Sequence, residues 1–250
     1  MRRWLLPPAL IALLVGSWQL AASTGAIAAA LHIESFLVPS PAEIASSLWE
    51  NRSLLAENAL VTLREIVFGI LAAVAIGVGF AVAMSRWRIV RDASYPLVVA
   101  SQTIPIVVIA PILVVWFGYG LTPKIVLIAL FCFFPITVNV LDGLRSVDPE
   151  AIKLMRSLDA SRWQRFWRVE APTALPNLFT GVKISVVFAP LAAVFAEWAG
   201  SNSGLGHLIQ SDTAYLEVAR QFATVAVLSA LALILMGLAM LAERRVVDWR

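Results

Sequence analysis

Long apolar runs separated by short polar segments organise this chain. The runs cover about residues 5–22, 60–84, 95–117, 121–141, 178–198 and 222–241. Each is close to the roughly 20 apolar residues that an α-helix needs to cross the hydrocarbon core of a bilayer. The pattern predicts an all-α membrane protein with six transmembrane helices, built as a single domain over residues 1–250.

The segment 148–176 differs from the rest because it is charged and has helical periodicity. Asp148-Pro149-Glu150 has the composition of a helix start, with an acceptor side chain, a proline and an acid in succession. A second start follows near Ser161, which forms a capping-box pattern with Gln164. The segment therefore predicts two short helices, and we expect the second to end at Pro172 and Pro176.

This predicted helical pair is aromatic on one side and basic on the other. One interpretation is an interfacial pair that rests on anionic lipid headgroups. Another is a docking element for a protein partner. The aromatic residues are Trp163, Phe166 and Trp167, and the basic ones are Arg162, Arg165 and Arg168.

The composition supports a membrane protein, with 60% hydrophobic and 14% charged residues and a mean hydropathy of +0.84. Fourteen of the 19 lysines and arginines lie in alternate polar segments, including the segment 148–176. By the positive-inside rule, both termini and this segment face the cytoplasm. The basic balance thus reports topology and indicates no nucleic-acid partner. We expect the first run to be a retained span, although Ala21-Ala22-Ser23 also resembles a signal-peptide cleavage site.

A few polar residues and prolines interrupt the apolar runs. Gln102 and Pro105 break the third run, and Asn139 lies in the fourth. A proline frees a backbone carbonyl, which a membrane tolerates where protein neighbours or a water-filled cavity satisfy it. These residues are candidates for lining a translocation pathway, with a kinked packing helix as the alternative. Glu197, at the end of the fifth run, is either a fourth candidate or a solvated interfacial carboxylate.

Small residues recur every four positions in the second run. A ridge of this kind allows two helix backbones to approach closely. We expect it to pack against another helix, with no transport role required. The ridge consists of Gly69, Ala73, Gly77 and Ala81.

Several kinds of chemistry have no matching motif in this sequence. The chain contains no Walker A pattern, no chain of intramembrane acids or histidines, and no hydrolase motif. The single Cys132 excludes an internal disulfide, and His32 and His207 have no partners at metal-ligand spacing. We therefore expect no catalytic, metal or cofactor site in this chain, and an energy source outside it.

The segment 148–172 resembles the cytoplasmic EAA loop of permease subunits in type I ABC importers. Asp159 falls on the loop's glycine, which permits a left-handed turn, and aspartate tolerates the same conformation. Val169, Ala171 and Pro172 fall on its terminal I-x-L-P motif. Lys153-Leu154-Met155 falls on E-A-A itself, so the chain lacks the glutamate of that motif.

The resemblance extends over about residues 61–249. The motifs around Thr62-Leu63-Arg64 and Glu197-Trp198 are similar to the importer branch for nitrate, sulfonates, taurine and thiamine pyrimidine precursors. Ser101-Gln102-Thr103-Ile104-Pro105 and Pro123-Lys124 are most similar to hydroxymethylpyrimidine permeases. The resemblance implies import of such a pyrimidine, with nitrate, sulfonate or taurine as alternatives.

The resemblance also implies the partners. Two permease copies in the bacterial inner membrane would form the pathway, a separate ATPase dimer would bind ATP and magnesium, and a periplasmic or lipid-anchored binding protein would deliver the solute. A non-transporting scaffold and an ATP-independent carrier are the competing interpretations. The residues implied to dock on the ATPase are Leu158, Asp159, Ala160, Ser161, Arg162 and Trp163. We expect Trp163, Phe166 and Trp167 to anchor the docking element against the membrane-spanning core.

Overall fold

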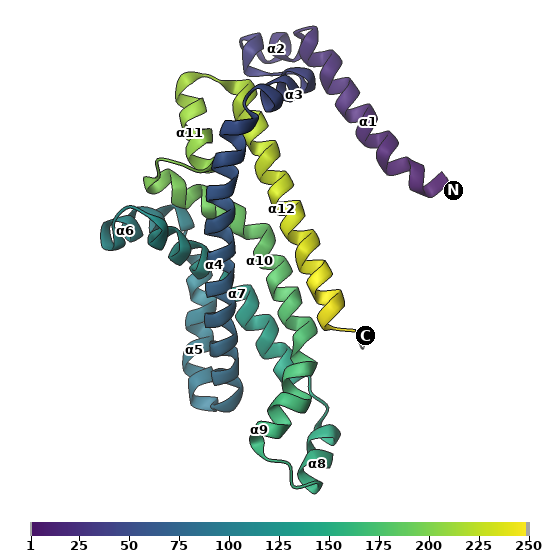
Figure 1. The fold of residues 1–250 in the computed structure, drawn as a ribbon, viewed down its shortest axis with the longest axis vertical. Helices are drawn as coiled ribbons and strands as arrows, with labels where there is room; N and C mark the ends of the chain where they lie inside the picture. The colour runs from purple at the N-terminus through teal and green to yellow at the C-terminus, as the bar shows by residue number, and fades with distance from the viewer. Residues whose placement is uncertain (1, 249–250) are drawn as a thin grey trace. The chain divides into compact units, whose positions relative to one another are not determined.

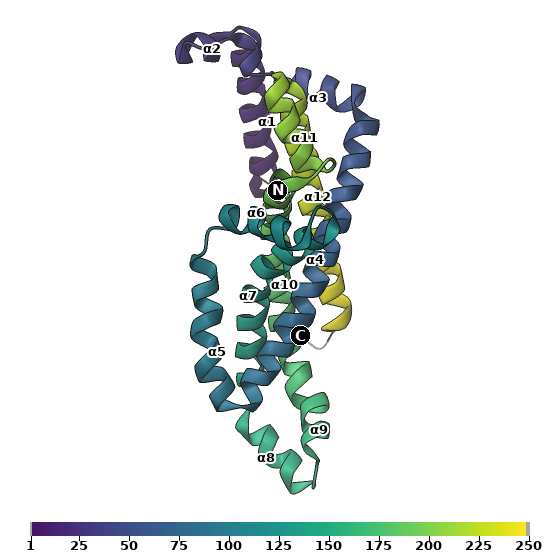
Figure 2. The same ribbon diagram turned by 90° about the vertical axis from the view of Figure 1, so that its left-hand side faces the viewer.

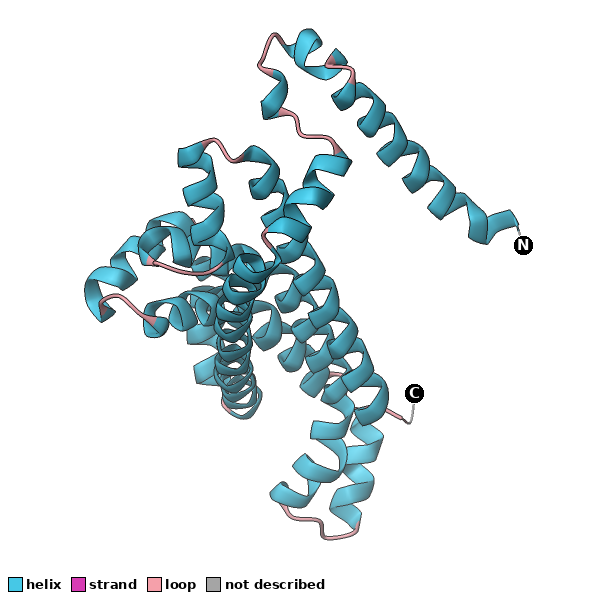
Figure 3. Ribbon diagram, turned by 45° about the horizontal axis from the view of Figure 1, so that its top comes forward, coloured by secondary structure: helices cyan, strands magenta, loops and turns pink. Residues whose placement is uncertain are grey.

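The computed structural model describes residues 2–248, with side chains for Leu6 and from residue 9 onward. Arg2, Arg3 and Arg250 contribute to the predicted orientation, but their side chains lie outside this description. Helices joined by short loops make up the described part of the chain (Figure 3). The chain forms two compact units, one of residues 1–61 and 203–229 and the other of residues 62–202 and 230–250.

The helices are labelled in Figure 1. Helices α4 and α12 contribute residues to both units. The bounds are α1 Arg2–Ser23, α2 Ala26–Leu31, α3 Pro41–Glu50, α4 Arg52–Arg86, α5 Arg88–Ala100, α6 Ile106–Phe117, α7 Leu121–Arg145, α8 Pro149–Ser157, α9 Arg162–Arg165, α10 Ala171–Gly200, α11 Leu205–Tyr215 and α12 Val218–Val246.

The first unit has a small apolar core. Helix α3 begins at Ser40, whose side chain forms a reciprocal capping box with Glu43. Asn58 Oδ1 accepts a hydrogen bond of 2.7 Å from the backbone N–H of Gly204, which connects α4 to the loop before α11. The core residues are Ile44, Leu55, Leu208 and Ala223, with Trp18, Leu48 and Val227 packed against them.

In the second unit, α7 and α10 pack closely (Figure 1). At Gly181 of α10, an added Cβ would lie 2.8 Å from the Cα of Ile136 in α7. The same helices exchange hydrogen bonds at Cys132 and Ser185: the thiol donates over 3.6 Å to the Ser185 carbonyl, and the Ser185 hydroxyl donates over 3.0 Å to the Cys132 carbonyl. Small side chains thus bring the two backbones together.

The predicted small-residue ridge of α4 packs against α7. Gly69 lies against the side chain of Ile128, and a Cβ at Gly77 would lie 2.9 Å from Cγ2 of Ile136. Ala73 and Ala81 are both fully buried. The prediction that this face packs on another helix is therefore confirmed.

Four helical stretches are long and apolar enough to cross a membrane: α4, α7, residues 162–200 and α12. The predicted third span is instead a bent pair, because the chain bends by 102° between α5 and α6. The break follows the three-residue 3₁₀ turn Ser101–Thr103, where Ile104 is extended, as expected before Pro105. Residues 9–23 form a shorter apolar helix, so the count of six spans stays a prediction.

The prediction that the second short helix ends at Pro172 and Pro176 is wrong. Helix α9 continues through a π-helical turn, Phe166–Glu170, directly into α10. Pro172 lies in the first turn of α10, where the wider π turn precedes it, and Pro176 lies within that helix. A π turn changes which carbonyls the following N–H groups reach, so it accommodates a proline that would interrupt a regular helix.

Candidate functional site

Both predicted helix starts of the helical pair α8 and α9 are confirmed. Asp148 caps α8 by accepting a hydrogen bond of 2.8 Å from the backbone N–H of Glu150. Ser161 caps α9 through a capping box, in which the Ser161 hydroxyl accepts from the Gln164 N–H and the Gln164 side chain accepts from the Ser161 N–H. Within the second unit, the pair extends beyond the end of α7 (Figure 2). Local capping alone thus defines the pair.

The turn between α8 and α9 is left-handed at Asp159, with φ = 52°. The Asp159 N–H donates to the carbonyl of Arg156 and the Ala160 N–H donates to that of Met155, each over 3.0 Å. These bonds close the C-terminus of α8 in the way a left-handed residue permits. The expected conformation at the position of the family's glycine is therefore present with aspartate.

Large apolar side chains are exposed on the helical pair. Leu154, Leu158 and Trp163 are 62%, 69% and 69% exposed. Trp167 is 54% exposed and contacts Trp163 edge-to-face, with ring centroids 5.4 Å apart. Trp163 and Trp167 are thus largely uncovered, although we expected them to anchor the pair against the helical core. Exposed apolar patches of this kind mark interaction surfaces.

A groove of about 830 Å³ lies between the helical pair and the end of α4. Most of its charged lining residues are basic, and the buried Nε of Arg165 has no hydrogen-bond partner among the described residues. We call this feature the basic groove. Its charged lining residues are Arg86, Arg156, Asp159, Arg162, Arg165 and Glu170.

The four candidate pathway residues lie on different elements. Gln102 and Pro105 are exposed at the break between α5 and α6. Asn139 in α7 donates through Nδ2 to the Pro135 carbonyl of its own helix over 2.7 Å. Glu197 in α10 is fully buried, which excludes the solvated interfacial carboxylate that the sequence left open.

Glu197 belongs to a buried polar cluster that the sequence pattern alone did not predict. Its Oε1 accepts a hydrogen bond of 2.7 Å from Thr62 of α4. Nearby in the sequence of α4, Glu65 forms a buried ion pair with Lys124 of α7. The detectable signal was the presence of opposite charges in two predicted spans, because such residues are costly in a membrane unless they pair.

The sequence of residues 66–248 matches a known protein family, described as the binding-protein-dependent transport system inner membrane component. This match covers most of the chain. The chain belongs to this family. The predicted resemblance to importer permeases is therefore confirmed, and the apolar helices are those of a membrane-embedded transport protein.

Two relatives of this permease have informative names. The formylaminopyrimidine transport permease protein ThiX of Halalkalibacterium halodurans is 34% identical over 225 residues, covering 90% of each chain. The riboflavin transport system permease protein RibX of Chloroflexus aurantiacus is 37% identical over 244 residues, covering 97% of this chain and 89% of the relative. Permeases of comparable similarity therefore carry different solute names.

A solved structure shares the permease fold. It is described as an inward-facing conformation of the MetNI methionine ABC transporter, with a TM-score of 0.67 and 20% identity. The match covers 79% of this chain and 98% of the other. It supports the all-helical permease fold of this chain.

Proposed function

We propose that this permease moves a small solute into the cell through a pathway formed by two copies, driven by a separate ATPase dimer that docks on α8 and α9. One observation carries the proposal: the helical pair exposes Leu158 and Trp163 beside the basic groove. An apolar patch with a charged border is what a protein partner would cover. The family also names binding-protein-dependent transport, which implies a solute delivered by another protein.

The docking tip consists of the residues nearest the left-handed turn. Asp159 fixes the turn, and Leu158 and Trp163 present apolar surface on either side of it. Arg162 lines the basic groove, so acidic residues on the ATPase would complement it. ATP and magnesium would bind to the ATPase, and this chain would transmit its movement. The tip comprises Leu158, Asp159, Ala160, Ser161, Arg162 and Trp163.

The proposed topology has six spans: α1, α4, the bent pair of α5 and α6, α7, the continuous helix 162–200, and α12. Both termini and the helical pair would then face the cytoplasm of a bacterial inner membrane. Gln102, Pro105 and Asn139 would line the pathway between the two copies. Glu197 would act at its outer end.

The proposed solute is a thiamine pyrimidine precursor of the hydroxymethylpyrimidine type. The printed name of the formylaminopyrimidine relative, which is 34% identical over 90% of each chain, supports this class. Nitrate, sulfonate and taurine are the alternative solutes. Competition for uptake in cells that carry the importer tests the solute class. Excess unlabelled hydroxymethylpyrimidine should block the uptake of labelled hydroxymethylpyrimidine, whereas excess taurine should not.

Co-purification tests the transport function itself. The permease, extracted in mild detergent, should co-elute with an ATPase whose activity rises when the loaded binding protein is added. Elution without an ATPase, together with no ATP-driven uptake in vesicles, would favour a scaffold. Uptake that needs no ATP would favour a stand-alone carrier. Either result would contradict the proposal.

A further inference from the structure

A buried polar cluster joins three helices of the second unit. Lys124 of α7 donates hydrogen bonds to Oε1 of Glu65 over 2.5 Å and to Oγ of Ser201 over 2.6 Å. Thr62, one turn before Glu65 on α4, donates to Oε1 of Glu197 on α10 over 2.7 Å. The exposed fractions are 1% for Glu65, 6% for Lys124 and 0% for Glu197. We call these five residues the latch cluster.

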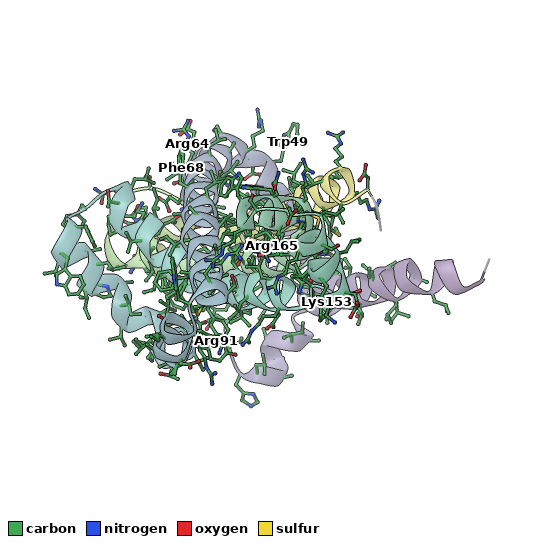
Figure 4. All side chains as sticks on the ribbon, turned by 90° about the horizontal axis from the view of Figure 1, so that it is seen from below. Trp49, Arg64, Phe68, Arg91, Lys153 and Arg165 are labelled. Carbon is green, nitrogen blue, oxygen red and sulfur yellow. The ribbon has the colours of Figure 1, made fainter. Side chains whose placement is uncertain are left out.

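The latch cluster is buried although neighbouring residues of α4 are exposed. Arg64 and Phe68 point outward from α4 (Figure 4), whereas Glu65 points into the contact with α7. The second carboxylate oxygen of Glu65, Oε2, is buried and has no hydrogen-bond partner among the described residues. An incompletely paired charge in this position costs free energy.

This cost is not needed to hold the helices together. Helices α4 and α7 already pack through Gly69 and Gly77, and α7 and α10 pack through Gly181. Replacing a buried ion pair by apolar residues is often neutral or stabilising. A charged cluster has a property that apolar packing lacks: once water enters, the attraction weakens and the separated ions become well solvated. Such a cluster is suited to a contact that must open.

The cluster lies at the ends of α7 and α10 that are farthest from the helical pair α8 and α9, and in the half of α4 that is farther from Arg86. Lys124 is in the first turn of α7, whose other end leads to α8. Glu197 is in the last turn of α10, whose first residue follows the π turn after α9. In the proposed topology these ends face the outside. A contact that opens there would control access from the binding protein.

We propose that Glu65, Lys124 and Glu197 are positioning residues that latch α4 to the outer ends of α7 and α10, and that they separate and become hydrated when the pathway opens outward. The inference rests on the proposed function, because it assigns the outer side and an ATP-driven opening. It assigns specific residues to the outer opening of the pathway, whereas the docking tip concerns the contact with the ATPase.

Thiol labelling of the complete importer tests the latch. Thr62→Cys, in a Cys132→Ser background that removes the single native thiol, places the reporter inside the cluster. A membrane-impermeant thiol reagent is added from outside, without nucleotide or after trapping with ATP and vanadate. We expect labelling at least about tenfold faster in the trapped state, since opening shifts the population that exposes this site.

Two matched cysteines calibrate the labelling. Thr137→Cys, equally buried but farther along α7, should stay unlabelled in both states. Ser53→Cys, exposed near the start of α4, should be labelled in both. If vanadate traps the importer but Thr62→Cys shows no faster labelling, the latch is refuted. If no ATPase associates and nothing is trapped, the proposed function fails instead.

Substitution of Lys124 tests the latch without any nucleotide. Lys124→Met leaves the buried Glu65 carboxylate without its cation, so water should enter and Thr62→Cys should be labelled about tenfold faster than with Lys124 present. Lys124→Arg keeps the charge and should restore slow labelling. If the cluster only stabilised the fold, Lys124→Met would lower the unfolding temperature and leave the labelling rate of Thr62→Cys unchanged. Unchanged labelling with Lys124→Met, or labelling of Thr137→Cys as well, would overturn the latch.

Discussion

Arg86 and Glu170 form a forked ion pair that joins the last residue of α4 to the π turn before α10. The guanidinium donates to the two carboxylate oxygens of Glu170 over 3.4 and 2.7 Å. It also lies over the ring of Phe166, 5.1 Å from the ring centroid. The contact therefore links α4 directly to the continuous helix that carries the proposed docking tip.

Reversing one charge of this pair should weaken the link. We expect Arg86→Glu to lower stability by about 1 kcal/mol, because a forked pair that is partly exposed is worth little more than this. ATP-driven uptake should fall further, since the link lies between the docking pair and α4. The double variant Arg86→Glu with Glu170→Arg should recover most of the uptake. Thermal unfolding and vesicle uptake measure the two effects.

Arg88→Glu is the control for this prediction. The Arg88 side chain is 84% exposed, and the ion pair that it forms among the described residues is with Asp92 of its own helix. Its reversal should leave both stability and uptake nearly unchanged. A double variant of Arg86 and Glu170 that is as impaired as either single variant would show that the pair does not act as a unit.

The left-handed turn at Asp159 predicts a second set of effects. Asp159→Gly should keep ATPase co-elution, because glycine adopts φ = 52° without steric cost. Asp159→Val should lose it, since a β-branched residue would be strained there by about 1–3 kcal/mol. Ser157→Val, in the exposed last turn of α8, controls for the added bulk. Equal co-elution of the glycine and valine variants would remove the turn from the docking argument.

Local signals predicted the helical pair correctly. The caps at Asp148 and Ser161 and the left-handed residue at Asp159 depend on a few neighbouring residues, so the sequence contains the whole pattern. The prolines were less informative. Pro105 accompanies a 102° break, whereas Pro111 stays inside α6 and Pro172 follows a π turn. Whether a proline breaks a helix depends on the surrounding packing, which local sequence does not contain.

The latch cluster shows a different limit of sequence reasoning. Glu65 and Lys124 are 59 residues apart; Glu65 directly follows Arg64 in its apolar run, and Lys124 is the single charge in the run 121–141. Their pairing follows from the close packing of α4 on α7 at Gly69 and Gly77. The small-residue ridge predicted that α4 packs on a helix but not which helix. Because the helix that packs on α4 was not known, Glu197 was a pathway candidate only through its position at the end of the fifth apolar run.

The basic groove predicts a salt-sensitive interaction with the ATPase. Arg156→Glu with Arg162→Glu should reduce co-elution of the ATPase strongly, because both side chains line the groove and would then repel acidic partner residues. Raising the salt concentration should weaken the native complex in the same direction. Arg168→Glu is the matched control, since Arg168 is exposed on the same segment outside the groove lining. Equal loss with Arg168→Glu would indicate a nonspecific charge effect.

The contact of α7 with α10 predicts that a single methyl group is too large at Gly181. A Cβ there would lie 2.8 Å from the Ile136 Cα and 2.9 Å from the Pro135 carbonyl oxygen, both backbone atoms that cannot rotate away. Gly181→Ala should therefore destabilise the permease by about 1–3 kcal/mol. Thermal unfolding in detergent measures this change.

Gly79→Ala provides the comparison within a helix of the same unit. Apart from the adjacent backbone of α4 itself, no described atom lies within 4 Å of a Cβ added at Gly79, so the change acts through helix propensity, and stability should rise by about 0.5–1 kcal/mol. A stability loss with Gly181→Ala and a gain with Gly79→Ala would show that the effect at Gly181 comes from the close approach of the α7 and α10 backbones, and not from the loss of a glycine as such. A stabilising Gly181→Ala would mean that the helices separate easily, and would contradict the close packing on which the latch argument depends.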